Sequence, residues 1–323
     1  MTGKRITLSD IAKKTGYSIN TVSHALNDKS DISEETKKFI KETADSMGYI
    51  QNSSASFLRS GKSKCISVIV GDIANPHFAI LVKEIEMTAK EHGYAAFVIN
   101  TNEDEAIEKE AIVTSLSRNV DGIIICPVQK SEQNIDFLKK SGVPFTLMGR
   151  RTKANDTNYV ICDDVHSGYI AAKHLLDKGH RKIAVFGGPS YISSAGERLE
   201  GIKSAFKNCK VKFDDANLYT LPTTLGDHSR IVDDALNGAE YTAAICFSDL
   251  IALEIMCNDY AKNLEVISFD NIKSKFRIPV EFTSISSSKT KMSNKAFEIL
   301  LHNIENPGCK PQQVILSTHI VEE

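Results

Sequence analysis

The sequence predicts two kinds of structure in one chain: a small all-α helix-turn-helix domain, followed by an α/β region of two doubly wound parallel-sheet lobes. Three observations lead to this prediction. Residues 7–48 contain three short amphipathic patterns of helical period, each with a capping residue. From residue 65 onward, apolar runs of strand length alternate with longer amphipathic stretches. This alternation starts again near residue 159, which indicates a second lobe.

The composition is that of an ordinary globular protein. Of the 323 residues, 41% are hydrophobic and 25% are charged. No apolar run reaches about 18 residues, so no transmembrane helix is expected. The first residues lack the apolar segment of a secretory signal, so a cytoplasmic location is expected. Seven cysteines are scattered singly, without a CxxC pair, which favours buried thiols over disulfides or a metal site, and no cofactor is expected.

The net charge of −2 is unevenly distributed. Residues 1–62 carry ten Lys or Arg and seven Asp or Glu, whereas the rest of the chain carries 29 and 34. This excess is modest, so charge alone is weak evidence for nucleic-acid binding. It does place the binding of any anionic partner at the N-terminal end.

Each helix of the first domain has its own boundary signals. Thr7 opens a capping-box pattern, TLSD, and the helix that follows ends near Gly16. Ser18 is placed to cap a second helix, and Ser33 a third that stops at Gly48. Two short helices joined by a tight turn and followed by a third form the helix-turn-helix arrangement.

The strands of the α/β region fall into two sets. The first set is CISVIV (65–70), YAAFVI (94–99), DGIIIC (121–126) and VPFTLM (143–148). The second is YVIC (159–162), KIAVF (182–186), AAIC (243–246) and EVISF (265–269). Thr283–Ser286 and Val314–His319 are expected as further strands, with a helix at Met292–Ile304 between them. Ligands of open α/β sheets bind at the carboxyl ends of the strands, so two such lobes predict a binding site in the cleft between them.

These patterns define the expected domains. Residues 1–51 form the helical headpiece, residues 52–62 a hinge helix or linker, and residues 63–323 the two-lobed domain. The N-terminal lobe is expected at about 63–161 and 288–310, and the C-terminal lobe at about 162–287 and 311–323.

No enzyme motif is found. The segment RSGKS (59–63) is similar to the end of a phosphate-binding P-loop, but that motif requires a glycine where this chain has Ser56, and a strand before it. GxGxxG, HExxH and GxSxG are absent, and no pair of carboxylates is singled out by its spacing. An enzymatic function is therefore not expected.

The stretch from Thr7 to Ser63 resembles the DNA-binding headpiece of the LacI/GalR family of bacterial transcriptional regulators. The matching residues in the headpiece are Thr-x-x-Asp-Ile-Ala (7–12), Gly16, Ser18, Thr21-Val22-Ser23, Leu26-Asn27, Gly48-Tyr49, Asn52, Ala55, Leu58 and Arg59. The resemblance continues over nearly the whole chain with Asn75-Pro76, Asp121-Gly122, Gly179-His180, Arg198-x-x-Gly201, Asp249 and Asp270. The two-lobed region also resembles the periplasmic binding proteins.

The resemblance implies which headpiece residues contact DNA. Ile19, Asn20 and His24 match the positions that read base edges from the second helix in the major groove. Asn20 can pair with adenine through both amide atoms, Ile19 can contact a thymine methyl, and His24 can donate to guanine N7. Many relatives carry Arg at the His24 position. The short hydroxyl side chains suit phosphate oxygens, with helix capping as an alternative or additional role for the first two. These are Thr7, Ser18, Thr21 and Ser23.

The hinge is implied to be a second DNA-reading element. Residues 53–59 are too few for a stable isolated helix, and in the family this segment folds when two copies meet in the minor groove. Leu58 matches the apolar wedge that enters between the central base pairs. Asn52 can cap the hinge helix, Ala55 allows two hinge helices to approach closely, and Arg59 can contact the groove or a phosphate. The motif does not require Phe57.

The family places its effector contacts at the strand ends that face the cleft. A planar Arg fork and carboxylates beside an apolar wall suit a hydroxyl-rich sugar. Phe78 fits the core equally well, and Arg198 has a surface ion pair with Glu197 or Glu200 as its alternative. Ser248 and Gly149 stand where relatives usually have Asn and Asp. The matched effector positions are Asp72, His77, Phe78, Ser194, Arg198, His228, Ser248, Asp249 and Asp270.

The resulting expectation is a sequence-specific transcriptional regulator, of the repressor type, for carbohydrate-related genes. It would bind a palindromic operator in double-stranded DNA as a homodimer, because one headpiece makes few contacts. A small-molecule effector, a sugar, would rotate one lobe against the other, either as inducer or as corepressor. Two alternatives stay open: a different effector (a purine, a sugar phosphate or a phosphoprotein corepressor), or a sugar-binding module without a regulatory role.

Overall fold

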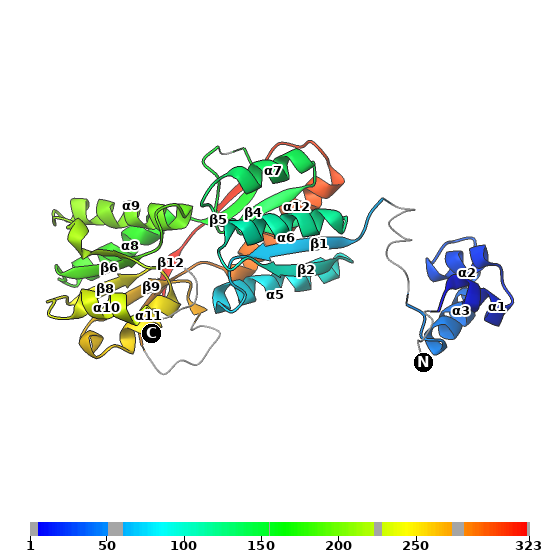
Figure 1. Ribbon diagram of the computed structural model, residues 1–323, viewed down its shortest axis with the longest axis horizontal. Coiled ribbons are helices and arrows are strands. Elements are labelled where there is room, and N and C mark those ends of the chain that lie inside the picture. The colour runs from blue at the N-terminus through cyan, green and yellow to red at the C-terminus, as the bar shows by residue number, and fades with distance from the viewer. Residues whose placement is uncertain (1–5, 51–60, 155, 223–227, 273–280, 322–323) are drawn as a thin grey trace. The chain divides into compact units, whose positions relative to one another are not determined.

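A computed structural model of the chain describes residues 6–50, 61–154, 156–222, 228–272 and 281–321 (Figure 1). The chain divides into two compact units, Met1–Ser63 and Lys64–Glu323. Within the described ranges, none of the helices combines the length and apolar character needed to span a bilayer. The same ranges hold no group of three or more His, Cys, Asp or Glu side chains placed to bind a metal ion.

The first unit is the predicted three-helix headpiece. Its helices are α1 (Leu8–Thr15), α2 (Ile19–Leu26) and α3 (Glu34–Ser46). Gly16 ends α1 in the left-handed conformation, with φ of 78°, which a glycine adopts without steric cost. Ser18 and Ser33 each accept a hydrogen bond from the backbone N–H three residues later, as caps do. The core between the helices is small and apolar: Ile11, Ala12, Val22, Ala25, Ile40 and Ala44.

The first sheet of the second unit is entirely parallel, in the order β11-β5-β4-β3-β1-β2. Its strands are β1 (Cys65–Val70), β2 (Ala95–Asn100), β3 (Gly122–Ile125), β4 (Phe145–Met148), β5 (Tyr159–Cys162) and β11 (Gln313–Leu316). Its helices are α5 (Pro76–Glu91), α6 (Glu105–Ser117), α7 (Gln133–Ser141) and α12 (Lys289–Glu305). One core lies under α5 and α12, and a second lies under α6 and α7. Because both faces are covered, the strands are apolar almost throughout.

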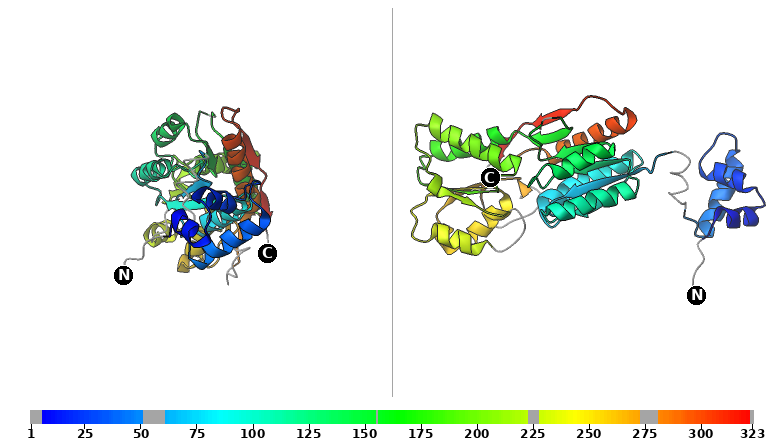
Figure 2. Two further views of the ribbon diagram at one scale, coloured as in Figure 1. Left: turned by 90° about the vertical axis from the view of Figure 1, so that its right-hand side faces the viewer. Right: turned by 45° about the horizontal axis from the view of Figure 1, so that its top comes forward.

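The second sheet has the order β12-β10-β9-β8-β6-β7 and is parallel except for the antiparallel strand β12. Its strands are β6 (Ile183–Gly187), β7 (Leu218–Thr220), β8 (Ala243–Cys246), β9 (Glu265–Phe269), β10 (Thr283–Ser286) and β12 (His319–Val321). The covering helices are α8 (Asp164–Asp177), α9 (Ser193–Asn208), α10 (Ser229–Leu236) and α11 (Asp249–Met256). Figure 2 shows each sheet between its helices, so the second unit consists of two doubly wound lobes.

Two details of the predicted lobes are wrong. The second predicted set of strands begins with Tyr159–Cys162, but β5 pairs with β4 in the first sheet, on the N-terminal side of the expected lobe boundary at about residue 161. The expected strand Val314–His319 is two strands in different lobes: β11 pairs in parallel with β5, and β12 pairs with β10. Residues 311–316 thus belong to the N-terminal lobe, and the last crossing follows Leu316. The apolar pattern identifies a strand but does not reveal which sheet edge it joins.

Candidate functional site

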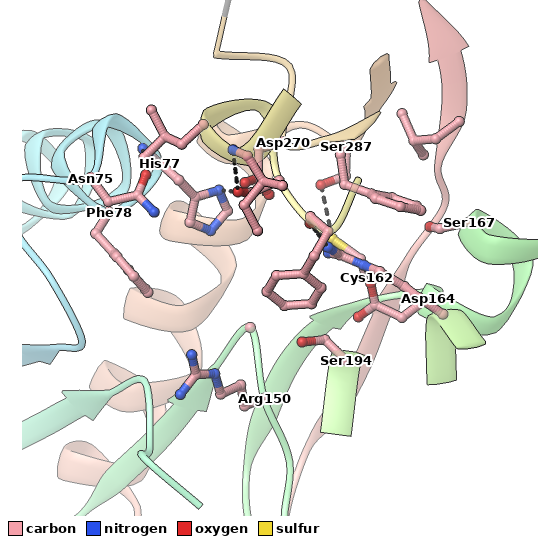
Figure 3. A pocket seen from close by; sticks show the side chains of 18 of the residues that line it. Asn75, His77, Phe78, Arg150, Cys162, Asp164, Ser167, Ser194, Asp270 and Ser287 are labelled. Atoms are coloured by element: carbon pink, nitrogen blue, oxygen red, sulfur yellow. Dashed lines mark hydrogen bonds and ion pairs between the residues drawn. The ribbon is translucent and has the colours of Figure 1, made fainter. Parts of the chain in front are cut away.

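A cavity of about 200 Å³ lies between the two lobes. Its walls come from the segments that follow β1, β4 and β5 in the N-terminal lobe and β6, β8, β9 and β10 in the C-terminal lobe. These are the carboxyl ends of parallel strands, where open α/β sheets bind their ligands. Figure 3 shows side chains of both lobes pointing into this space.

The structure brings seven of the nine predicted effector residues to the cavity wall. These are His77, Phe78, Ser194, Arg198, His228, Ser248 and Asp270. Residues from α5 and α9, from the N-caps of α10 and α11 and from the turn after β9 therefore meet at one place, as the family positions imply. Their part in ligand binding remains a prediction.

Asp72 and Asp249 do not line the cavity. Asp72 accepts the backbone N–H of Ala74 at 3.0 Å, within the turn before α5. Asp249 is fully buried, and its carboxylate accepts bonds from the Ser284 hydroxyl at 2.7 Å and the Ile272 backbone N–H at 2.7 Å. Burial raises the pKa of Asp249 to about 6. The expected effector contact at Asp249 is thus corrected: this side chain holds the turn after β9.

That turn presents Asp270 in an unusual backbone conformation. Asp270 has φ of 97° and Asn271 has φ of 48°, a region that residues other than glycine seldom adopt. The Lys289 ammonium binds the Asp270 carbonyl oxygen from the start of α12. Non-glycine residues in such conformations persist only when their surroundings hold them, and they concentrate at functional sites.

Asp270 contacts the opposite lobe through His77. Its Oδ1 lies 3.3 Å from the His77 Nδ1, and Figure 3 shows the ring turned toward the carboxyl group. Burial lowers the pKa of His77 to about 4, so the ring is neutral near pH 7. The two side chains lie close together between the lobes at the edge of the cavity, but the buried His77 Nδ1 makes no hydrogen bond within the described residues.

Arg198 is the cavity's positively charged group from the C-terminal lobe. Its Nε donates to Asp164 Oδ1 at 2.8 Å, and its Nη1 donates to the Phe247 carbonyl oxygen at 2.7 Å. The guanidinium carbon lies 4.3 Å from the ring centre of Phe269 and 4.9 Å from that of Phe247. Burial raises the pKa of Asp164 to about 6, against the lowering effect of the Arg198 charge. The surface ion pair considered for Arg198 is therefore wrong, because its partner is the buried Asp164.

Two glycines allow this pairing, because α8 and α9 touch backbone to backbone. A Cβ at Gly168 would lie 2.0 Å from the Arg198 carbonyl oxygen, and a Cβ at Gly201 would lie 1.9 Å from the Val165 carbonyl oxygen. No other residue fits at either position without separating the helices. The close approach places Arg198 of α9 over Asp164 of α8.

The N-terminal lobe contributes a second arginine pair, which the sequence did not reveal. Arg150 Nη1 and Nη2 donate to the two Glu103 oxygens at 2.8 and 2.7 Å, and Nη1 also donates to the Pro127 carbonyl oxygen at 2.7 Å. Both side chains are buried. A Cβ at Gly71 would lie 2.2 Å from Glu103 Oε1, so glycine is needed there as well. The 47 residues that separate Glu103 from Arg150 left no local signal for this pair.

The remaining polar groups are mostly engaged by neighbouring residues. His228 Nδ1 lies 2.8 Å from Glu254 Oε2, and the Cys162 Sγ lies 2.9 Å from the Ser287 hydroxyl. Ser248 caps α11 by accepting the Ile251 N–H. Among the described lining residues, the acidic side chains Glu103, Asp164, Glu254 and Asp270 face the basic side chains Arg150, Arg198 and Lys289. The described part of the cavity wall therefore carries no excess of positive charge.

In the headpiece, the predicted base-reading residues lie on the accessible side of α2. Ile19 is 52% exposed, Asn20 is exposed, and His24 is half-buried. The predicted residues of the hinge lie outside the described residues. These are Asn52, Ala55, Leu58 and Arg59.

The predicted phosphate ligands differ in accessibility. The Thr7 hydroxyl donates to Asp10 at 2.7 Å, and the Ser18 oxygen accepts the Thr21 N–H at 3.1 Å, so Thr7 and Ser18 both serve at helix starts. Thr21 is half-buried, so its hydroxyl group is partly accessible to solvent. Ser23 is only 6% exposed, which makes it the least accessible of the four, and its contact with phosphate stays a prediction.

Two family profiles cover the chain almost end to end. Residues 7–52 match bacterial regulatory proteins of the lacI family, and residues 63–297 match the periplasmic binding proteins and sugar binding domain of the LacI family. The chain belongs to the LacI family. It is thus a DNA-binding transcriptional regulator, as the headpiece residues had indicated.

Known relatives of this LacI-family regulator align with it over their full length. The HTH-type transcriptional repressor PurR of Glaesserella parasuis serovar 5 (strain SH0165) is 28% identical over 316 residues, which cover 96% of this chain and 93% of the relative. PurR of Aliivibrio fischeri (strain MJ11) is 27% identical over 310 residues, or 93% and 92%.

Solved structures confirm the architecture. The lac repressor dimer bound to operator and the anti-inducer ONPF has a TM-score of 0.84 and 23% identity, with 99% and 98% of the two chains covered. The Enterococcus faecium LacI family transcriptional regulator with bound ribose has a TM-score of 0.69 and 25% identity, with 80% and 97% covered. The helical headpiece and two parallel-sheet lobes are those of the family.

Proposed function

We propose that this regulator represses transcription by binding a palindromic operator as a homodimer in the cytoplasm, and that a neutral, hydroxyl-rich ligand of sugar size in the inter-lobe cavity controls it. The cross-lobe contact between His77 and Asp270 is the observation that carries this proposal. A ligand that touches both His77 and Asp270, or that takes the place of one of them, binds one relative position of the lobes more tightly than another. Only such differential binding shifts a conformational equilibrium.

The polar groups of the cavity favour a sugar. Asp270 accepts from hydroxyl groups, and the Arg198 guanidinium keeps Nη2 for a ligand, because within the described residues only its Nε and Nη1 are engaged. The rings of Phe78, Phe247 and Phe269 supply apolar wall. A sugar phosphate fits poorly, because each arginine already faces a carboxylate and the described lining carries more acidic than basic side chains.

A flat heteroaromatic base such as a purine is the second candidate. The same three phenylalanine rings favour it, together with the neutral His77, which can pair with a base edge. The two candidates use different groups of the cavity. A purine base stacks on the faces of the phenylalanine rings, whereas a sugar forms hydrogen bonds with Asp270 and the Arg198 guanidinium.

The dimer has a candidate surface in the N-terminal lobe. The edge strand β2 leaves Phe97 and Val98 each 43% exposed, beside a shallow groove lined by Ile99, Thr114 and Val120. An exposed apolar edge strand pairs or aggregates unless another surface covers it. A second copy of the chain covers it in this proposal, and the two headpieces then meet two operator half-sites.

Ligand titration tests the effector. Unliganded protein is titrated calorimetrically with ribose, xylose, glucose, cellobiose, ribose 5-phosphate, hypoxanthine and guanine. We expect binding of a neutral sugar that Asp270→Ala abolishes and that Asp72→Ala, outside the cavity, leaves intact. Binding of a purine that survives Asp270→Ala would replace the sugar by the second candidate, and binding of the sugar by Asp270→Ala at wild-type strength would remove the cavity assignment.

A gel shift tests the operator. The full-length chain selects duplexes from a randomised library, and the selected sequence is compared with random DNA at several salt concentrations. We expect a palindrome, a preference over random DNA of at least about 1,000-fold, and an affinity that falls steeply with salt. Selection of a sequence without two-fold symmetry would contradict the dimeric mode.

A further inference from the structure

One side-chain pair on the headpiece is not explained by folding or by the family positions. His24 Nδ1 lies 2.6 Å from Asp31 Oδ2, with side chains that are 39% and 56% exposed. His24 occupies the last full turn of α2, one turn after Asn20, so the two share a face. Asp31 comes from the loop between α2 and α3. The pair therefore lies on the side of α2 that carries the predicted base contacts.

The loop is built so that Asp31 reaches His24. Asp28 adopts φ of 54°, which turns the chain back at the end of α2. The Lys29 backbone N–H then donates to the His24 carbonyl oxygen at 3.0 Å, which fastens the loop to the helix. Asp28 is itself held by the Lys41 ammonium of α3. The position of Asp31 is thus set by the backbone on one side and by α3 on the other.

The chemistry of the pair determines which nitrogen of His24 carries a proton. A carboxylate can only accept hydrogen bonds, and the hydrogen bond from His24 lowers the pKa of the Asp31 carboxyl below its usual value. Nδ1 must therefore donate. In a neutral imidazole with its proton on Nδ1, the outer nitrogen Nε2 is an acceptor.

We infer that Asp31 is a positioning residue for base recognition: it fixes a proton on His24 Nδ1, which leaves Nε2 of the imidazole as an acceptor, so this position reads a base that presents an amino group. Adenine N6 and cytosine N4 present such donors in the major groove, whereas guanine presents the acceptors N7 and O6. The donation to guanine expected from the sequence then requires a doubly protonated ring. The inference rests on the proposed contact between α2 and base edges.

The test measures base preference and not affinity alone. The full-length chain first selects a duplex about two helical turns long from a randomised library. Every base pair of one half-site is then changed to the other three, and the affinities of the four duplexes are compared at about pH 8, well above the ordinary histidine pKa. Ratios between duplexes for one protein are independent of the fraction that is folded.

At the one position that loses its preference in His24→Ala, wild type should favour adenine or cytosine over guanine at about pH 8, by about fivefold or more. Asp31→Ala frees the neutral ring to place its proton on Nε2, so the discrimination against guanine at about pH 8 should disappear. Asp28→Asn removes an equal charge from the same loop and suits the left-handed backbone there, and it should change all four affinities alike.

The outcomes separate the inference from the proposed function. If His24→Ala alters preference at no base pair, the base contact of the proposed function fails. If it alters one position but wild type already prefers guanine there at about pH 8, the inference is overturned. The same follows if Asp31→Ala and Asp28→Asn give identical preferences.

Discussion

The two lobes each turn one buried arginine pair toward the same cavity, but the two pairs are arranged differently. Arg150 meets both oxygens of Glu103 and the Pro127 carbonyl, so the whole outer end of its guanidinium is engaged within its own lobe. Arg198 meets one oxygen of Asp164 and the Phe247 carbonyl, and it lies beside two aromatic rings. In the first arrangement both terminal nitrogens are bonded within the protein, whereas in the second the terminal Nη2 has no bond among the described residues and can serve a ligand.

The comparison of the two arginine pairs shows that an arginine side chain in a binding cavity does not necessarily contact the ligand. What matters is how many of its donors the protein itself uses. An arginine whose two terminal nitrogens are both bonded within the protein, as in the Arg150–Glu103 pair, is part of the cavity wall. Removal of one partner of such a buried pair leaves a charge without compensation. An incompletely bonded arginine is oriented by the same kind of carboxylate but keeps a donor for the ligand. Four experiments test this contrast between the two arginine pairs and the groups around them.

The largest effect is expected from Arg150→Met. It leaves the Glu103 carboxylate buried without a partner, and the apparent free energy of unfolding should fall by about 3–5 kcal/mol. Urea denaturation followed by circular dichroism measures it. The double variant Arg150→Met with Glu103→Gln removes the orphaned charge and should recover most of the loss. An unchanged midpoint in the single variant would show that the pair carries no structural role.

Arg198→Lys should act on ligand binding more than on stability. Lysine keeps the charge but cannot reach Asp164, the Phe247 carbonyl and a ligand with one planar group. Loss of one charge-assisted hydrogen bond corresponds to about 1.5–3 kcal/mol of binding free energy. Calorimetry with the sugar identified in the ligand panel measures it. Equal affinity of variant and wild type would place Arg198 with Arg150 as a wall residue.

Gly168→Ala tests whether helix contact positions the Arg198 pair. The new Cβ would meet the Arg198 carbonyl oxygen at 2.0 Å, so the helices must separate, at a cost of about 1–3 kcal/mol in the free energy of unfolding. Ligand affinity should fall as well. Gly196→Ala, also in α9, has no atom nearer than 4.0 Å to its Cβ and should be neutral or slightly stabilising. Similar losses in both variants would exclude a specific role for the α8–α9 contact.

The smallest effect is a dependence of stability on pH. Burial raises the pKa of both Asp164 and Asp249 to about 6 from an ordinary value of 3.8. Between these values the folded chain binds more protons than the unfolded chain, so the contribution of each group to stability falls as the pH rises from about 4 to about 6 and is constant above that. Between about pH 4 and about pH 6, the thermal unfolding midpoint should fall less, or rise more, with increasing pH in Asp164→Asn and in Asp249→Asn than in wild type. A larger fall, or a smaller rise, in either variant would contradict the sign.

Much of the fold was predictable because its signals are local. Ser18 and Ser33 cap helices through a backbone N–H three residues away, and a buried parallel strand shows itself as an apolar run. The carboxyl ends of those strands indicate where a ligand binds, and the family resemblance supplied the nine effector positions, of which seven lie at the cavity wall. The assignment of strands to lobes failed where the chain crosses, at β5, β11 and β12, because pairing partners lie far apart in the sequence.

The sequence alone predicts the kind of protein: a capped helical headpiece, alternating strands and helices, and a family whose functional positions can be matched residue by residue. Only the tertiary structure shows which partners the matched side chains have. It buried Asp249 and Ser23, paired Arg150 with Glu103 across 47 residues, and turned Asp31 onto His24. Caps and apolar runs depend on residues that are close in the sequence, so the sequence reveals them. The partner of a charged or polar side chain depends on which distant backbone segments the packed core brings within hydrogen-bond distance.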